Sequence, residues 1–374
     1  MRATAYDYVI FGAGVFGLYA AKILGTKGLR VALIEFDQAP LQRASFINQA
    51  RVHNGYHYPR SVSTAEKSAS YYARFNQEFN FAINQSFRKI YAISKTDSLT
   101  NASQFLKFCK YVNIPATEIQ ADQYFRKGSV EAAFETLEYS YDAAKIRDWF
   151  IEKLNRIPSI NISYGMDLMN VVVDGNQYVL NFVNGETLIA PNVLNVTYAS
   201  TNQILNKFNA DFLKIKYEIC EVILTKANKE LEGKGITMMD GPFFSVMPFG
   251  LSGLHSLTSV VDTPHMSSTE ALPTFPCQSK NNKCSPMQLM NCSLCESKPN
   301  SAFTRMKQLA NKYLSDNLSF EYDHSLFAVK TILAEAELDD SRPTVIKRLS
   351  TAPNLYTVMS GKFNTIYDLE EALL

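Results

Sequence analysis

The chain carries its densest group of chemically versatile side chains in the stretch ARVHNGYHYPRS, residues 50–61. Two histidines, two tyrosines and two arginines surround one glycine, a mixture too polar for a core strand and too aromatic for an ordinary surface loop. Histidine can exchange a proton near neutral pH, and arginine binds carboxylate or phosphate through two hydrogen bonds. These residue types favour a binding or catalytic role. The competing interpretation is that His53 and His57 are structural histidines in a buried turn.

A glycine motif precedes this stretch and reads Gly12-Ala13-Gly14-Val15-Phe16-Gly17. In a strand–turn–helix, the first glycine permits the tight turn, the second lets the backbone approach a pyrophosphate, and the third lets helix and strand pack closely. The helix N-terminus then offers free N–H groups to phosphates. Glu35 follows the next apolar run, where an acidic residue holds a ribose hydroxyl. The motif predicts FAD or NAD and disfavours NADP, the alternative being a glycine-rich turn without a ligand.

The elements around the motif predict an α/β fold. Residues 8–11 and 31–34 are short apolar runs typical of buried strands, and the residues between them form a helix that ends near Gly25 or Gly28. Such a unit builds parallel sheets. Further helices are expected at 63–81, 101–115, 143–158 and 302–314. Strands are expected at 87–94 and 217–228 and, with Asp-Gly and Asn-Gly turns, within 161–200.

Two parts of the chain resemble the D-amino-acid oxidase-like superfamily of FAD-dependent oxidoreductases, which includes glycerol-3-phosphate dehydrogenases, 2-hydroxyglutarate oxidases and glycine oxidases. Several members carry a His-x-Gly-x-Tyr-Tyr element after the second strand, and this chain has His53-Asn54-Gly55-Tyr56-His57-Tyr58. Near its end, LDDSRPTVIKRLSTAPNLYTVMSGKF is similar to the Asp-x-Arg-Pro element, strand and glycine turn of the superfamily. The turn departs from the usual pattern of several glycines, because only Gly361 is present and Lys362 follows it.

The resemblance implies FAD as cofactor and predicts three catalytic residues. His53 would orient the substrate or take a proton from a hydroxyl, and Arg342 would clamp its carboxylate or phosphate. Lys362 would lie beside the flavin and stabilise negative charge. Arg51 and Arg60 are weaker candidates for the anion clamp. A surface or interface position for Arg342 and a solvated Lys362 are the alternatives. The predicted cofactor-binding residues are Gly12, Gly14, Val15, Phe16, Gly17, Glu35, Phe36, Arg43, Ser45, Val171 and Gly361.

The predicted fold is a Rossmann-type FAD-binding domain built from discontinuous segments plus a mixed α+β substrate domain. Residues 1–82, 140–212 and 326–374 are assigned to the FAD-binding domain. Residues 83–139 and 213–325 are assigned to the substrate domain, with a cysteine-rich insertion at about 262–300, where proline, serine and asparagine replace periodic hydrophobic residues.

Four cysteines stand in this insertion: Cys277, Cys284, Cys292 and Cys295. The last two form a Cys-x-x-Cys pair, whose spacing lets two thiolates face one ion, and four cysteines suffice for a tetrahedral structural zinc site. Two disulfides, an iron–sulfur cluster and free thiols are the alternatives. Cys109 and Cys220 stand in apolar contexts typical of buried cysteines.

The composition excludes some classes of function. The 374 residues carry a formal net charge of +1, so no charge field indicates nucleic acid or an anionic membrane as a partner. No apolar run has the length of a membrane span, and a cytoplasmic location is expected. The predicted function is oxidation of a C–H next to an amine or hydroxyl of a small, anionic substrate by hydride transfer to FAD. The alternatives are a non-redox flavoenzyme resembling a sugar mutase, and an FAD-binding scaffold whose zinc insertion docks a partner.

Overall fold

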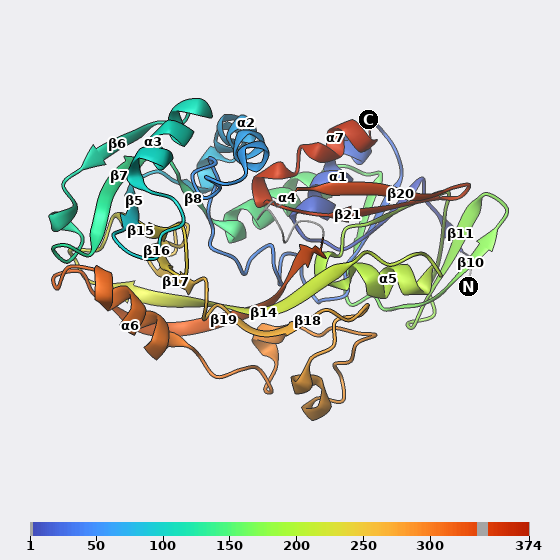
Figure 1. Ribbon diagram of the computed structural model, residues 1–374. Coiled ribbons are helices and arrows are strands. Elements are labelled where there is room, and N and C mark those ends of the chain that lie inside the picture. Colours follow the sequence, from blue (N-terminus) through green and yellow to red (C-terminus); the bar gives the residue numbers. More distant parts are fainter. Residues whose placement is uncertain (1–2, 335–342, 374) are drawn as a thin grey trace.

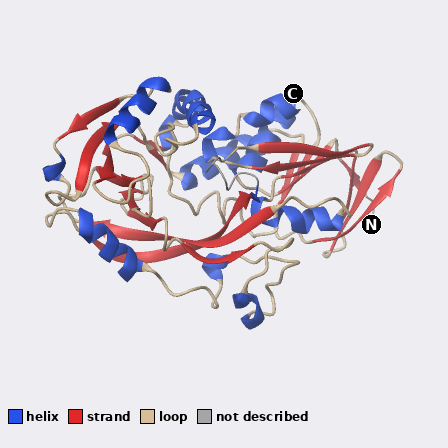
Figure 2. Cartoon of the chain, viewed as in Figure 1, coloured by secondary structure: helices blue, strands red, loops and turns tan. Residues whose placement is uncertain are grey.

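The computed structural model describes residues 3–334 and 343–373. Its strands form three larger sheets and one short pairing of β4 (Ile83–Asn84) with β8 (Ser140–Tyr141). In the view of Figures 1 and 2, several helices lie in the upper part of the molecule, the helix at residues 303–313 lies at the lower left, and loops of the cysteine-containing segment lie at the bottom.

A six-stranded sheet in the order β20-β21-β13-β2-β3-β9 lies next to the predicted nucleotide-binding turn. Its strands are β2 (Tyr8–Phe11), β3 (Val31–Ile34), β9 (Ile160–Ser163), β13 (Asn192–Asn195), β20 (Val345–Thr351) and β21 (Asn354–Met359). All neighbours run parallel except the edge strand β20, which is antiparallel to β21. Helices α1 (Val15–Thr26), α2 (Val62–Glu78), α4 (Ala143–Asn155) and α7 (Asp368–Leu373) share one hydrophobic core with this sheet. The uninterrupted apolar runs of β2 and β3 suit a sheet that is covered on both faces.

A four-stranded sheet in the order β1-β12-β11-β10 takes three of its strands from the sequence between β9 and β13, whereas its edge strand β1 precedes β2. It consists of β1 (Thr4–Ala5), β10 (Leu168–Asp174), β11 (Gln177–Phe182) and β12 (Thr187–Ala190), and α5 (Thr201–Lys207) follows β13. Gly175 and Gly185 take positive φ angles of 57° and 86°. This conformation allows the tight turns that the Asp-Gly and Asn-Gly pairs predicted.

The third sheet has nine strands in the order β18-β14-β17-β16-β15-β5-β7-β6, with β19 also paired to β14. They are β5 (Arg88–Ser94), β6 (Ala116–Ile119), β7 (Val130–Thr136), β14 (Ile215–Ala227), β15 (Lys234–Met239), β16 (Phe244–Pro248), β17 (His255–Ser259), β18 (Pro264–Ser268) and β19 (Phe320–Leu333). Helices α3 (Ala102–Tyr111) and α6 (Phe303–Tyr313) pack against it. The long antiparallel pair of β14 and β19 extends from this sheet toward the six-stranded sheet (Figure 1).

The predicted α/β class, with a parallel sheet assembled from separated segments, is confirmed. Every strand of the six-stranded sheet lies in a segment assigned to the FAD-binding domain, while the domain boundaries themselves stay a prediction. The cysteine-rich segment differs slightly from expectation. Residues 264–268 form β18, in which Ser268 pairs with Tyr217 of β14, so the irregular part begins after that strand. None of the helices in the described residues is long and apolar enough to cross a bilayer.

Phe75 of α2 joins this helix to the C-terminal segment. It has no exposed surface, and its ring centroid lies 4.7 Å from that of Phe79, 6.1 Å from Tyr141 and 5.9 Å from Phe363. We expect Phe75→Ala to lower the free energy of unfolding by about 3–5 kcal/mol, because the cavity left by a buried ring is only partly refilled. Urea denaturation measures this change. Tyr111→Ala is the control, since 72% of Tyr111 is exposed, and equal losses in both variants would contradict the role given to Phe75.

Candidate functional site

The glycine turn between β2 and α1 has no room for side chains. Gly12 takes a φ of +101°, and a Cβ there would lie 3.0 Å from the Val196 carbonyl oxygen. A Cβ on Gly17 would lie 1.8 Å from the carbonyl oxygen of Gly12, a distance no side chain can adopt. The first and third glycines therefore let strand, turn and helix approach one another as the motif predicted.

The N-terminus of α1 presents backbone donors to the space in front of it. Its N-cap is Gly14, which supplies no side-chain cap, and no acidic residue stands in its first turn. The Val15 N–H donates to the Ser45 hydroxyl over 3.1 Å. Uncapped N–H groups and the positive end of the helix dipole make this terminus able to hold a phosphate group.

Glu35 is fixed just beyond β3, beside the same turn. Its Oε2 accepts a hydrogen bond from the Ala13 N–H at 2.7 Å, and its Oε1 accepts one from the Asp37 N–H at 2.9 Å. Burial raises the pKa of this carboxyl group. The two hydrogen bonds and the charge of Arg43 act in the opposite direction and lower it. Arg43 in turn donates to both oxygens of Asp37 at 2.7 and 2.8 Å. A carboxylate held in this way could accept hydrogen bonds from ribose hydroxyls.

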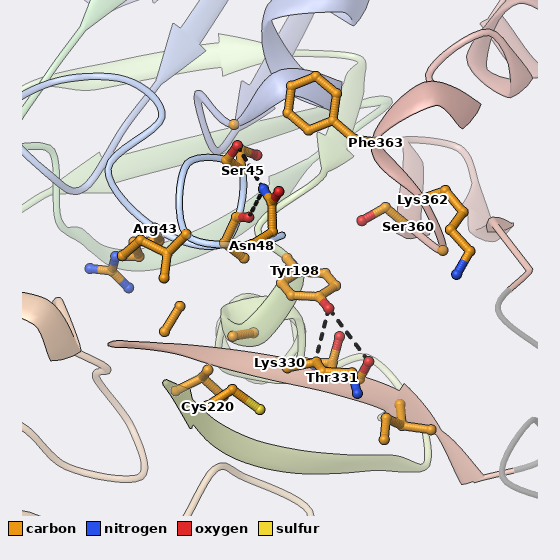
Figure 3. A pocket seen from close by; sticks show the side chains of 18 of the residues that line it. Arg43, Ser45, Asn48, Tyr198, Cys220, Lys330, Thr331, Ser360, Lys362 and Phe363 are labelled. Atoms are coloured by element: carbon orange, nitrogen blue, oxygen red, sulfur yellow. Dashed lines mark hydrogen bonds between the residues drawn. The ribbon is translucent and has the colours of Figure 1, made fainter. Parts of the chain in front are cut away.

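A cavity of about 830 Å³ begins at this turn and extends to the loop after β21. Ligand pockets in proteins usually enclose ~300–1,000 Å³, so the space is sufficient for an extended ligand. Figure 3 shows Arg43 and Ser45 on one side of it and Ser360 and Lys362 on the other. Nucleotide-binding groups and the candidate catalytic groups therefore face one continuous space.

Most of the predicted site residues line this cavity. They are Gly12, Gly14, Val15, Phe16, Glu35, Phe36, Arg43, Ser45, His53, Gly361 and Lys362. Gly17 lies in the first turn of helix α1 and does not line the cavity. Val171 does not line the cavity: it lies in β10 opposite Leu180, where its side chain packs with the four-stranded sheet. Its place at the wall is taken by Met166, Asp167 and Leu168, which precede or begin that strand. Arg342 lies outside the described residues.

Lys362 and two histidines form the end of the cavity opposite Arg43. The Lys362 Nζ lies 4.0 Å from the centre of the Tyr58 ring, a cation–π contact. Burial, and then the charge of Arg51, lower the pKa of Lys362 to about 7. Burial also lowers the pKa of His53 and His57 well below the usual histidine value, with the charges of Lys362 and Arg51 adding to the effect. Both imidazoles are therefore neutral at neutral pH.

The facing wall comes from the β14–β19 pair and was not expected from the sequence. Cys220, Lys330 and Thr331 line the cavity there, and burial raises the pKa of the Cys220 thiol to about 12. The Thr331 N–H donates to the Tyr198 hydroxyl over 3.2 Å, which connects this wall to the segment after β13 (Figure 3). No local motif marks these residues, because the wall exists only once the two long strands pair.

Arg51 takes part in a buried network instead of standing free as an anion clamp. Its guanidinium donates to the Tyr91 hydroxyl at 2.8 Å, to Ser245 at 2.8 Å and to Thr237 at 3.2 Å. Its Nε lies 3.4 Å from Oε2 of Glu138, and both side chains are fully shielded from solvent. Sequence reasoning missed Tyr91 and Glu138 altogether. The other weak candidate, Arg60, forms an ion pair with Asp240 at 2.8 Å.

The zinc prediction is not supported. Cys277, Cys284, Cys292 and Cys295 do come together around one small cavity, and all are free thiols. However, the described part of the chain contains no group of three or more His, Cys, Asp or Glu residues placed to hold a metal ion. Burial raises the pKa of the Cys292 thiol to about 12 and also raises that of Cys277. The Cys295 sulfur accepts a hydrogen bond from Asn281. Cys109 and Cys220 are buried, as predicted.

Known proteins resemble the chain in sequence and in fold. The sequence model of the family described as "DAO: FAD dependent oxidoreductase" matches residues 7–151. The FAD-dependent monooxygenase FPY4 of Fusarium mangiferae is 25% identical over 98% of this chain and 89% of its own length. The FAD-dependent monooxygenase kojA of Aspergillus flavus is 26% identical over 66% of this chain and 59% of its own.

Solved structures share the fold over nearly the whole chain. L-alpha-glycerophosphate oxidase from Mycoplasma pneumoniae has a TM-score of 0.73 at 15% identity, covering 98% of this chain and 92% of that one. Glycine oxidase from Geobacillus kaustophilus has a TM-score of 0.71 at 12% identity, covering 97% and 91%. The glycine turn, the fixed Glu35 and the family match over residues 7–151 agree with one another, and together they support an FAD-dependent oxidoreductase similar to the D-amino-acid oxidase-like superfamily.

Proposed function

We propose that this FAD-dependent oxidoreductase oxidises a C–H next to an amine or hydroxyl of a small anionic substrate. The observation that carries the proposal is that His53 and Lys362 line the same cavity as the nucleotide-binding turn. A neutral imidazole and a lysine with a lowered pKa therefore line the space where a bound substrate would contact the cofactor. Perturbed titratable groups that converge in a pocket are typical of reactive sites.

The cofactor-binding roles proposed for individual residues follow from the geometry of the turn. The N–H groups that follow Val15 in the first turn of α1 would hold the pyrophosphate, and Gly14 would let it approach. Glu35 would bind the ribose of the adenosine, with its orientation set by Ala13 and Asp37. Bound FAD supplies the two-electron oxidising chemistry that no amino-acid side chain offers.

The substrate end of the cavity would bind an anion through Lys362. Its ammonium group is half-buried, and an anion beside it would stabilise the charged form. Lys330, which lines the same cavity, adds a second positive charge but is paired with Glu218 at 3.6 Å. His53 would accept a proton from a substrate hydroxyl. An amine substrate that arrives neutral needs no such base.

Monooxygenation is a second candidate, favoured by the names of the two fungal relatives. It differs in its requirement for a reductant, because inserting one oxygen atom into a substrate consumes two further electrons. The sugar-mutase alternative would turn over without net oxidation. The scaffold alternative has lost its basis, since it relied on a zinc-bound insertion.

An anaerobic titration tests these functions together. The purified protein, loaded with FAD, is mixed without oxygen with a panel of small amino and hydroxy acids. Bleaching of the visible flavin bands by one compound would support direct substrate oxidation and identify its class. Bleaching only by NADH or NADPH, followed by uptake of oxygen into a product, would favour monooxygenation. Flavin bands that no member of the panel and no nicotinamide bleaches would contradict both.

Gly14→Val is expected to abolish retention of FAD. A Cβ at this position would already lie 3.0 Å from the Ser45 hydroxyl, and the two further methyl groups would occupy the space in front of the helix terminus. The ratio of flavin absorbance to protein absorbance after gel filtration measures retention. Thr26→Val, at the exposed end of the same helix, is the control and should keep its flavin. A fully loaded Gly14→Val protein would overturn the phosphate assignment.

Anion binding should weaken as the pH rises. Because the pKa of Lys362 is lowered to about 7, its charge is present below this pH and is lost above it. We therefore expect the Kd of acetate, measured by its perturbation of the flavin spectrum, to rise about tenfold per pH unit above pH 7. Uncharged acetamide serves as the matched ligand and should bind independently of pH. Lys362→Met should bind acetate weakly at every pH, whereas an unchanged pH dependence in this variant would remove Lys362 from the site.

A further inference from the structure

Glu138, which follows β7, has its two carboxylate oxygens engaged by different parts of the chain. Oε2 accepts a hydrogen bond from the Tyr91 hydroxyl at 2.6 Å and faces Arg51. Oε1 accepts a long hydrogen bond of 3.4 Å from the Asn54 N–H and lies 3.8 Å from Nδ1 of His53. One oxygen thus anchors the side chain, and the other is directed toward a histidine that lines the cavity.

The Nδ1 atom of His53 is buried and has no hydrogen-bond partner among residues 3–334 and 343–373. A buried polar atom without a partner costs free energy, so it calls for an explanation. Nε2, on the other side of the ring, remains available to the cavity that His53 lines. Catalytic hydrogen bonds are often long in the absence of substrate and shorten when it binds. The separation of 3.8 Å between Nδ1 and Oε1 is of this kind.

We propose that Glu138 is a positioning residue that holds His53 with its proton on Nδ1, so that Nε2 can accept a proton from a substrate hydroxyl. The inference rests on the proposed function and narrows its substrate class to hydroxy compounds. The hydroxyl proton goes to Nε2 of His53, the C–H bond of the carbon that bears the hydroxyl breaks, and this carbon becomes a carbonyl carbon. The hydrogen leaves with both electrons of that bond as a hydride, which the oxidising chemistry that bound FAD supplies would take up.

The groups around His53 explain why it needs a carboxylate. Arg51 comes from its own segment, Lys89 from β5, and Lys362 from the loop after β21, and all three disfavour a positive charge on the ring. His57 adds to this effect, while the Tyr58 ring lies 5.9 Å away. Within the described part of the chain, Glu138 brings a carboxylate oxygen to 3.8 Å from Nδ1 of the ring. It would stabilise the imidazolium that forms when the proton arrives, as the carboxylate does in a catalytic triad.

The tautomer of His53 tests the proposal in the resting holoenzyme, without turnover. The chain contains five histidines, so selective ¹⁵N labelling of histidine gives few NMR signals, and His53→Asn identifies the signal of interest. The proposal predicts a proton on Nδ1 and a bare Nε2. A proton on Nε2 would overturn it, whatever substrate the enzyme proves to oxidise.

Kinetics provide the second test. Glu138→Gln removes the charge but keeps the shape, and should lower the plateau rate of flavin reduction by a hydroxy acid by about 10²-fold, with little change in KM. The acid limb of its pH profile, where the rate falls because His53 becomes protonated, should move to lower pH by about one unit or more. The reason is that the imidazolium loses its counter-ion, which lowers the pKa of His53. Glu138→Asp, which keeps the charge, should recover part of the rate if the protein folds.

Glu135→Gln is the matched control, since Glu135 lies in β7 and pairs with Arg88 at the surface. It should leave both rate and pH profile unchanged. A Glu138→Gln protein that loses activity without any shift of the acid limb would reduce Glu138 to a structural residue and overturn the proposal. If no hydroxy or amino compound reduces the flavin, the proposed function fails, but the tautomer measurement still decides whether Glu138 positions His53.

Discussion

The buried ion pair between Arg51 and Glu138 is the contact on which the site depends. It joins the segment that begins at Ala50 to the nine-stranded sheet, because the guanidinium also bonds to side chains of β5, β15 and β16. Removing one partner of such a pair leaves an uncompensated buried charge, which typically costs about 3–5 kcal/mol. The two residues therefore stabilise the fold only as a pair, and their contact fixes where the histidines of this segment stand relative to the sheet.

The same pair controls the electrostatics of the cavity. Arg51 contributes to the lowered pKa of Lys362 and of both His53 and His57. Its charge is partly balanced by Glu138, whose Oε2 lies 3.4 Å from Nε of Arg51. The charges of Arg51 and Lys362 help to keep the imidazoles neutral, which is the state that a proton acceptor requires.

The parts of the site that could be predicted from the sequence are those encoded locally. The glycine turn and Glu35 lie within one strand–helix–strand unit, whose geometry fixes their positions relative to one another. Val171 does not line the cavity, because it lies in the β10–β11 hairpin opposite Leu180. The closeness of the four cysteines was foreseen, and Phe275 and Leu289 line the same small cavity.

The Glu138 network could not be predicted, because it joins distant parts of the sequence. Tyr91 lies 40 positions after Arg51, and Ser245 lies 194 positions after it. Each residue alone is an ordinary member of a strand or loop, and no spacing links them. They form a network only when parallel pairing of β5 with β15 brings Lys89, Tyr91 and Thr237 to one face of the sheet.

Under the proposed function, this arrangement would couple substrate binding to proton transfer. An anion beside Lys362 would cancel the charge that disfavours a proton on His53, so binding itself would raise the pKa of the imidazole. The histidine would then be a poor proton acceptor in the empty cavity and a better one in the complex. Glu138 would stabilise the protonated imidazole both in the empty cavity and in the complex. The bound anion would add to this stabilisation only in the complex. A neutral compound of the same shape would bind without providing it, and the cavity would therefore select anionic substrates at the chemical step as well as in binding.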